Sequence, residues 1–384
     1  MGPHEGLLHL KEYDIKDSNV EQIGNDIDHR VKYASAATEP AWDDGIVGKE
    51  VGLFIWRIED FIVVGWPNDK AGEFHEGDSY IILHSYKVGE GEHQKLQHEI
   101  YFWLGSKTTQ DEAGTAAYKT VELDEFLKGA TQHREIQQAP SDAFLTLFPQ
   151  LKILGGGVKS GFTHVEEAAP QGVTTLLRIF KLSTAIMVVE VELTWKSLDD
   201  GDVFVLDSGQ KIWVWQGGSC SPMEKAKAAQ VVHEMTLAKH IDVEVISQLE
   251  SRSQILVGLL GGQDVQQRHF QCARPVSSIR AKRPSKLLRF SDASGSLLLD
   301  VVKDGQSIKQ HDLESKNVFL LDIAGSVWVW KGKQASQGEK ATWLRAAQMY
   351  IKQLQDFPDS YFTPLASVTE GSESSAFLRA VEVS

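Results

Sequence analysis

One short pattern occurs three times in this chain, and it constrains the fold more than any other feature. In residues 201–235 the run GDVFVLD is followed by a polar turn, by KIWVWQG and by SPMEKAKAAQVVHEM. Alternating apolar and β-branched residues predict two strands of a hairpin, and the last run predicts a helix with an N-cap serine. The same order occurs at 77–127 and at 316–353. Each copy has a tryptophan at the equivalent position: Trp103, Trp215 and Trp330.

The distance between these copies indicates what is being repeated. A spacing of roughly 110 residues is the size of a whole domain and far exceeds a solenoid repeat. Each copy contains about five strand-like runs, one long helix and a short one, with the strands grouped apart from the helices. This pattern predicts an α+β fold, in which each domain has a central, mostly antiparallel (mixed) sheet flanked by helices. We expect an N-terminal extension at 1–46, domains at 47–161, 162–262 and 287–384, and a linker at 263–286.

The acidic composition of the chain indicates which kinds of ligand it can bind. The chain of 384 residues has a formal net charge of −14, from 53 acidic and 39 basic side chains. This surplus disfavours a nucleic-acid backbone and suits a hard cation such as Ca²⁺, which takes oxygen ligands. Two cysteines, the lack of a signal-peptide pattern and the lack of a membrane-length apolar run predict a protein of the reducing cytoplasm without a membrane span. We also expect a monomer. No catalytic motif occurs in the sequence, so we do not expect an enzyme.

An acidic residue recurs near the start of each predicted long helix. These residues are Glu112, Glu224 and Glu339. In a capping box, a glutamate at this position returns to the N-cap backbone N–H. Alternatively, it could share a Ca²⁺ ion with the polar residue that leads into the first strand of each copy, which is Asp78, Asp202 or Asn317. The pattern alone leaves both interpretations open.

The first copy carries a resemblance to a known family. The runs GDSYIIL, YFWLG, QDEAGTAAYKTVELDEFLKGATQHRE and GGGVKSGF resemble the first domain of the gelsolin superfamily. The whole chain, over about residues 40–384, is similar to the three-domain severin/fragmin group. The resemblance implies a cytoskeletal protein that severs actin filaments, caps their barbed ends and promotes nucleation in response to Ca²⁺. Capping without severing remains an alternative, as does an inert scaffold whose helix-start acids serve only as caps.

The resemblance also implies one calcium site in each domain. In the first domain the ligands would be the carbonyls of Gly77 and Val158 together with Asp78 and Glu112. In the second they would be Gly201, Asp202 and Glu224, with Glu250 as a weak candidate for a fourth ligand. In the third domain the equivalent residues are Lys316, Asn317 and Glu339. The loss of one carboxylate there is expected to weaken the site, because calcium affinity follows ligand charge.

A further site is implied at the end of the first long helix. The resemblance places Asp124 and the carbonyls of Gly129 and Thr131 in a calcium site that actin completes, whereas the alternative for Asp124 is an ordinary solvated acid. The helix 111–128 would contact actin through Ala117, Tyr118, Val121 and Asp124, although plain core packing also explains its apolar residues.

Four basic residues give a further prediction. Arg178 and Lys181 occur where relatives contact the side of the filament. Together with Lys152 and Lys159 they also match positions that bind phosphoinositides in relatives. Because a lipid patch usually requires more basic residues than these, ordinary solvated side chains remain the competing interpretation.

Overall fold

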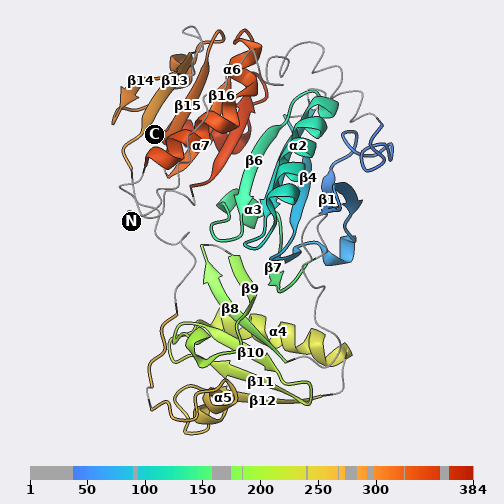
Figure 1. Cartoon of the computed structure of the whole chain (residues 1–384), viewed down its shortest axis with the longest axis vertical. Coiled ribbons are helices and arrows are strands. Elements are labelled where there is room, and N and C mark those ends of the chain that lie inside the picture. The colour runs from blue at the N-terminus through green and yellow to red at the C-terminus, as the bar shows by residue number, and fades with distance from the viewer. Residues whose placement is uncertain are drawn as a thin grey trace, which may run out of the picture.

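The computed structural model describes residues 38–89, 94–157, 174–183, 185–238, 241–266, 268–272, 283–291, 298–323, 325–354 and 363–383. Its strands form two mixed sheets with helices packed on their faces (Figure 1). The predicted α+β class is therefore confirmed. Three successive groups of elements, called the first, second and third unit below, repeat one arrangement.

The first unit opens with the hairpin predicted from VGLFIWRIEDFIVVG. Its elements are β1 (Gly52–Glu59), β2 (Ile62–Gly65), β3 (Glu73–His75), β4 (Ser79–Val88), β5 (Lys95–Leu104), α2 (Gln110–Leu127), β6 (Thr131–Ile136), α3 (Asp142–Leu145) and β7 (Leu151–Leu154). Ahead of it, Trp42 of the N-terminal extension is buried and packs edge-on against Trp56, with ring centroids 4.6 Å apart. The described end of the extension therefore packs onto the first unit through Trp42.

The other two units follow the same order. The second consists of β8 (Thr175–Leu182), β9 (Ala185–Val191), β10 (Val203–Asp207), β11 (Lys211–Gln216), α4 (Pro222–Ala238), β12 (Asp242–Ser247) and α5 (Ser253–Leu259). The third consists of β13 (Lys286–Ser291), β14 (Leu298–Asp304), β15 (Val318–Ile323), β16 (Ser326–Lys331), α6 (Gln337–Ala341), α7 (Trp343–Gln353), β17 (Leu365–Thr369) and α8 (Ser375–Val383). Short 3₁₀ turns lie at Asn68–Lys70, Trp195–Ser197 and Gln310–Asp312.

In each unit the repeated pattern forms an antiparallel hairpin, a helix and a parallel strand. The hairpins are β4–β5, β10–β11 and β15–β16, and the parallel partners of their second strands are β6, β12 and β17. The sequence predicts a single long helix in the third unit, but the structure divides it into α6 and α7. At the break, the Thr342 hydroxyl donates to the Gly338 carbonyl at 2.9 Å, a bond that competes with the helical ladder.

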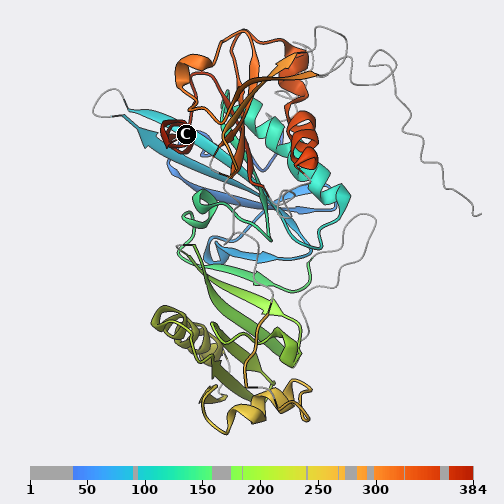
Figure 2. The same ribbon diagram turned by 90° about the vertical axis from the view of Figure 1, so that its left-hand side faces the viewer.

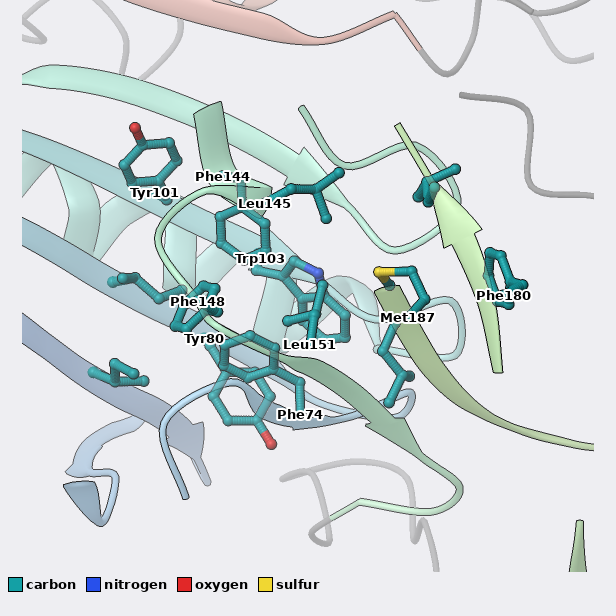
Figure 3. Close-up of a cluster of buried hydrophobic side chains, with 14 residues drawn as sticks. Phe74, Tyr80, Tyr101, Trp103, Phe144, Leu145, Phe148, Leu151, Phe180 and Met187 are labelled. Atoms are coloured by element: carbon teal, nitrogen blue, oxygen red, sulfur yellow. The ribbon is translucent and has the colours of Figure 1, made fainter. Parts of the chain in front are cut away.

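The units do not keep separate sheets, which the sequence pattern does not show. The order β12-β11-β10-β8-β9-β7-β3 joins strands of the first and second units in a seven-stranded sheet. Phe180 and Met187 of the second unit enter the aromatic cluster of the first unit around Phe74 and Trp103 (Figure 3). The predicted boundary at 161 lies outside the described residues.

A second fusion joins the first and third units. In the order β14-β13-β15-β16-β17-β6-β5-β4-β1-β2, strand β17 pairs antiparallel with β6 through three residue pairs, one of them Ala366↔His133. This β6–β17 contact is called the seam below. Helices α2 and α7 lie on the same face of the sheet, whereas α8 lies on the other face (Figures 1 and 2). No helix in the described ranges is both long and apolar enough to span a membrane.

Candidate functional site

The Gly-Asp pair of the first unit lies where β4 begins. Asp78 has an exposed fraction of 0%, and the Gly77 amide donates to the Gly156 carbonyl at 2.9 Å. A Cβ on Gly157 would lie only 2.3 Å from Asp78 Oδ1, so the backbone can pass this close to the carboxylate only as glycine. The run GGG therefore wraps around the aspartate. Val158, the next predicted ligand, lies outside the described residues.

Glu112 reaches the same region from the start of α2. Its amide donates to the N-cap side chain of Thr109 at 3.3 Å, and its carboxylate accepts a hydrogen bond from Thr108 Oγ1 at 3.0 Å. Thr108 Oγ1 also shares a 2.7 Å hydrogen bond with Ser79, the neighbour of Asp78 in sequence. Glu112 has an exposed fraction of 2%, so the structure brings two buried acids to one end of the sheet.

The second unit repeats this arrangement with a capping box at the helix start. Asp202 and Glu224 are both buried. Glu224 accepts from the Ser221 amide at 2.7 Å and donates its own amide to Ser221 Oγ at 3.3 Å. Its other carboxylate oxygen accepts from the Lys181 amide at 2.8 Å. A capping glutamate and a candidate ligand are therefore the same residue here.

An arginine contacts the aspartate in both units. Arg178 Nε donates to Asp202 Oδ2 at 2.6 Å, and Arg178 has an exposed fraction of only 4%. In the first unit Arg57 Nη1 lies 3.4 Å from Asp78 Oδ2, which also accepts from the Tyr80 hydroxyl at 3.2 Å. Burial and the charge of Asp78 raise the pKa of Tyr80, so the phenol remains a hydrogen-bond donor.

The third unit lacks this pair. Asn317 Nδ2 donates to Glu314 Oε2 at 3.1 Å, and Lys316 is exposed. Glu339 and Ser336 form a capping box, with bonds of 3.2 and 3.1 Å. Only one buried carboxylate therefore remains at this position, so this site fits calcium poorly.

The donor set of the first two units fits Ca²⁺. Each has a buried aspartate that follows a glycine at the strand entry and a buried glutamate at the start of the next helix, and calcium binds carboxylate and carbonyl oxygens. Across the described ranges no group of three or more His, Cys, Asp or Glu side chains is placed to hold a metal ion. A calcium ion at either site would therefore depend on two carboxylates plus carbonyls. The weak candidate Glu250 instead pairs with Arg252 at 2.6 Å on the surface.

The three residues of the second implied calcium site also lie together. Asp124 Oδ1 accepts from the Ala130 amide and Oδ2 from Gln132 Nε2, both at 2.6 Å. Gly129 and Thr131 flank Ala130 in the turn that leaves α2, where Lys128 and Gly129 have positive φ values of 62° and 121°. Lys331 of the third unit is buried nearby. Its burial lowers the pKa of this lysine, although the charges of Asp124 and Glu125 oppose that change.

The predicted contact face of α2 is partly covered. Tyr118 has an exposed fraction of 49%, whereas Ala117 and Val121 are half-buried. Ala117 packs at the margin of the core cluster around Ala116 and Leu123. The helix therefore performs core packing and also presents Tyr118 to solvent, so the two sequence interpretations are compatible.

The predicted basic residues do not gather on one surface. Arg178 is buried against Asp202, and Lys181 is exposed. Lys152 lies 3.5 Å from Glu73, and Lys159 is outside the described residues. Sequence reasoning missed the role of Arg57 entirely. Its signal was present, because each copy has an arginine on its first strand in the runs IWRIE, LLRIF and LLRF.

Comparison with known proteins identifies the family. The family model described as "Gelsolin repeat" matches residues 64–145 and 184–255. The chain is 40% identical to "Gelsolin-like protein 1" of Lumbricus terrestris, over 90% of this chain and 92% of that protein. It is 35% identical to "Severin" of Echinococcus granulosus, over 98% of this chain and 99% of that protein. The chain belongs to the gelsolin family.

Two further similarities concern other members and a solved structure. "Actin depolymerising venom protein gelsolin 1" of Platymeris rhadamanthus is 36% identical, over 86% of this chain and 88% of that protein. A solved chain titled "Crystal Structure of the Thorarchaeota 2DGel3/rabbit actin complex" is 22% identical with a TM-score of 0.23, over 53% of this chain and 97% of that chain. At that score the likeness adds nothing to the fold described above. The two gelsolin-repeat matches fall in the first and second units, and the third unit repeats their strand pairing outside them.

Proposed function

We propose that this gelsolin-family protein binds actin, severs filaments, caps their barbed ends and promotes nucleation under the control of calcium. The observation that carries the proposal is the pair of buried carboxylates at equivalent positions in two units, Asp78 with Glu112 and Asp202 with Glu224. Support for actin comes from the family and from relatives named severin and actin depolymerising protein, which align over nearly their whole lengths. The proposed role is binding, with no catalysed reaction, in the cytoplasm and on the cytoskeleton.

The second-unit site is connected to the linker that leads to the third unit. Asp200 Oδ1 accepts from the Phe270 amide at 2.7 Å, and Asp199 Oδ2 accepts from the Cys272 amide at 3.0 Å. Both aspartates belong to the loop that ends in Asp202. A bound calcium ion would supply a double positive charge shared by Asp202 and Glu224. Any shift of the loop toward Glu224 would pull on residues 270–272, and so on the connection to the third unit.

The seam is the contact that such a pull would open. It consists of the β6–β17 pairing, a hydrogen bond from Gln97 Nε2 to the Glu373 carbonyl at 2.9 Å, and the burial of Lys331 near Asp124. Departure of the third unit would expose Asp124, Gly129 and Thr131 at the end of α2. There, a carboxylate from actin could complete a second calcium site, which couples calcium and actin affinity reciprocally.

We therefore assign the actin contacts as follows. The second unit attaches to the side of the filament through its exposed surface, including Lys181. Helix α2 then inserts between actin subunits through Tyr118, Ala117 and Val121 and remains on the barbed end. Arg178 is excluded from the filament contact in the arrangement described, because it is buried. A phosphoinositide contact at Lys152 and Lys181 has weak support, since Lys152 is already engaged by Glu73.

Imaging of single actin filaments tests the proposal. We expect filaments to break within minutes in micromolar calcium, the range of calcium sensors of about 10⁻⁷–10⁻⁵ M, and to stay intact with chelator. The variant Asp78→Asn, Asp202→Asn is expected to lose this response, and Asn317→Ala serves as the matched control that keeps it. Filaments that stay intact with calcium would defeat severing. Depolymerisation after dilution then separates a pure capping protein, which slows loss, from an inert scaffold, which has no effect.

A further inference from the structure

We infer that Arg178 and Arg57 act as built-in cations that occupy Asp202 and Asp78 and compete with calcium, more strongly in the second unit than in the first. This inference concerns the regulation of the sites and rests on the proposed function. Nothing in the sequence pattern of the acids themselves indicates it. It follows from the register of the strands and from the contacts of three arginines.

The three arginines occupy one structural position. In each unit the first strand pairs antiparallel with the strand that follows the Gly-Asp position. The paired residues are Arg57↔Tyr80, Arg178↔Phe204 and Arg289↔Phe319. Tyr80, Phe204 and Phe319 each stand two residues after the strand-entry position, which is Asp78, Asp202 or Asn317. Every unit therefore has an arginine at the same register position relative to the strand-entry residue.

The contact of the arginine follows the identity of that residue. In the second unit, Arg178 Nε and Nη2 both lie 2.6 Å from Asp202 Oδ2. In the first unit Arg57 approaches Asp78 only to 3.4 Å, and its Nε donates to Glu59 at 2.7 Å. In the third unit, where asparagine replaces the aspartate, Arg289 lies 3.4 Å from Asp300, and both of these side chains are exposed. The ion pair between the arginine and the strand-entry residue is thus tight in the second unit, loose in the first and absent in the third.

Electrostatics explains why such a pair opposes calcium. A guanidinium keeps its charge at any accessible pH, so it cannot release the carboxylate by losing a proton. Calcium at Asp202 would bring two positive charges beside a buried third, where repulsion is poorly screened. Arg178 must therefore give up Asp202, at least in part, before calcium binds. Asp199, whose Oδ2 lies 3.8 Å from Arg178 Nη2, is the nearest alternative partner.

In the first unit the release is easier. Arg57 is already held by Glu59 and lies over the Trp66 ring at 4.8 Å, so it keeps two favourable contacts after leaving Asp78. Because Arg57 leaves Asp78 more easily than Arg178 leaves Asp202, calcium binds at Asp78 at a lower concentration than at Asp202.

Calcium titration calorimetry on the full chain without actin tests this inference. We expect Arg178→Met to tighten calcium binding at the second-unit site by about tenfold to a hundredfold, within the usual range of coupling between two ligands. Arg57→Met should tighten the first-unit site by about fivefold, at the lower end of that range. Arg289→Met is the matched control and should change neither site. Arg178→Lys keeps the charge and should stay within about threefold of the unmodified protein, since a change that small is below typical coupling.

The alternative is that the arginines only stabilise the fold. In that case Arg178→Met would lower the melting temperature equally with and without calcium and leave both affinities unchanged, which would overturn the inference. If Arg178→Met does not fold, Arg57→Met decides by the same comparison, because its pair is weaker. If the unmodified protein binds no calcium, uptake by Arg178→Met supports the inference. If neither the unmodified protein nor Arg178→Met binds calcium, the inference is overturned together with the calcium part of the proposed function. If both bind calcium tightly and with the same affinity, the inference alone is overturned.

Discussion

The second and third units are built from the same pattern yet differ at the residue that enters the first strand of the hairpin. Asp202 is buried and paired with Arg178, whereas Asn317 contacts Glu314 near the surface. The glutamate at the helix start caps the helix in both, through Ser221 and Ser336. A capping glutamate therefore says little about metal binding. The two units differ instead in the strand-entry residue and in the contact that the arginine of the first strand makes with it.

The two units also attach differently to the first unit. The second contributes Phe180 and Met187 to a shared apolar core (Figure 3). The third attaches through the seam, where Gln132 pairs with Ser367 and where Trp328 packs edge-on against His133 at 5.8 Å. Separation of an apolar core exposes its area to water, but polar groups at a seam can exchange their bonds for water at a smaller net cost. The third unit is thus suited to detach from the first unit, whereas the second unit is suited to stay attached and to bind calcium.

The largest effect is expected from Asp202→Asn, which gives the second unit the strand-entry residue of the third. The substitution leaves the buried Arg178 guanidinium without its charged partner at 2.6 Å, and the loss of one member of a buried pair costs about 3–5 kcal/mol. Urea unfolding in chelator measures this change in the free energy of unfolding. The matched control Asp300→Asn removes the exposed partner of Arg289 and should cost less than about 1 kcal/mol. If Asp202→Asn and Asp300→Asn lower the free energy of unfolding equally, the buried pair in the second unit is no more important for stability than the exposed pair in the third.

The next effect concerns the seam and depends on pH. Although burial opposes it, hydrogen bonds from His133, Tyr101 and Tyr86 lower the pKa of Glu99 from 4.5 to about 2. A carboxyl group with a lowered pKa stabilises the folded state above pH 4.5, and this stabilisation is lost as the pH falls toward 2. The shift corresponds to about 3 kcal/mol. Because His133 contacts Trp328 and Tyr86 bonds to Ser375, we expect the loss of this charge to weaken the attachment of the third unit as well.

Comparison of the unmodified protein with Glu99→Gln isolates that contribution. The difference in their free energies of unfolding should be near its maximum at pH 7 and should shrink between pH 4.5 and 2. Small-angle scattering at pH 7 should also show a larger radius of gyration for Glu99→Gln, as the third unit separates. A difference that is independent of pH would mean that Glu99 acts through shape and not through its charge.

A third prediction compares the two capping glutamates directly. Glu224→Gln weakens the hydrogen bonds from Ser221 and Lys181 and removes a charged calcium ligand, so it should cost about 1–2 kcal/mol and eliminate one bound calcium. Glu339→Gln should cost about 1 kcal/mol through the weakened cap and leave the amount of bound calcium unchanged. Equilibrium dialysis with calcium, alongside urea unfolding, measures both quantities. Loss of a calcium ion from Glu339→Gln would show that the third-unit site is functional.

Much of the fold could be predicted because local patterns determine it. The alternation in VFVLD and KIWVWQ and the cap at Ser221 specify a hairpin and a helix without reference to the rest of the chain. The fusion of the sheets could not be predicted in this way. The pairings of β17 with β6 and of β7 with β9 join residues far apart in sequence, and no local pattern encodes which edges meet.

The sequence predicts the acids of the candidate calcium sites, whereas it does not predict the arginines beside them. Asp78, Glu112, Asp202 and Glu224 follow a repeated pattern, and all four side chains are buried in the structure. The predicted surface role of Arg178 depended on its charge, but its burial depends on the register that sets Arg178 opposite Phe204. A charge on a strand can face either side of the sheet, and only the pairing of the strands decides which.

The smallest effect, and the sharpest test of the comparison, is expected from Asn317→Asp. The substitution restores the carboxylate to the third unit, where Glu339 already stands at the helix start and Lys316 can supply its carbonyl. Its effect on unfolding should stay within about 0.5 kcal/mol, because residue 317 is only half-buried and a partner, Arg289, lies on the neighbouring strand. Calorimetry should detect one additional calcium ion, bound weakly, with a dissociation constant in the range of about 10⁻⁴–10⁻³ M.

Combination with Arg289→Met should tighten that new site, since the restored aspartate would otherwise attract the arginine as Asp202 attracts Arg178. If Asn317→Asp binds no additional calcium even without Arg289, then the missing carboxylate is not what separates the third unit from the second, and the difference must lie in the carbonyl groups that surround the site.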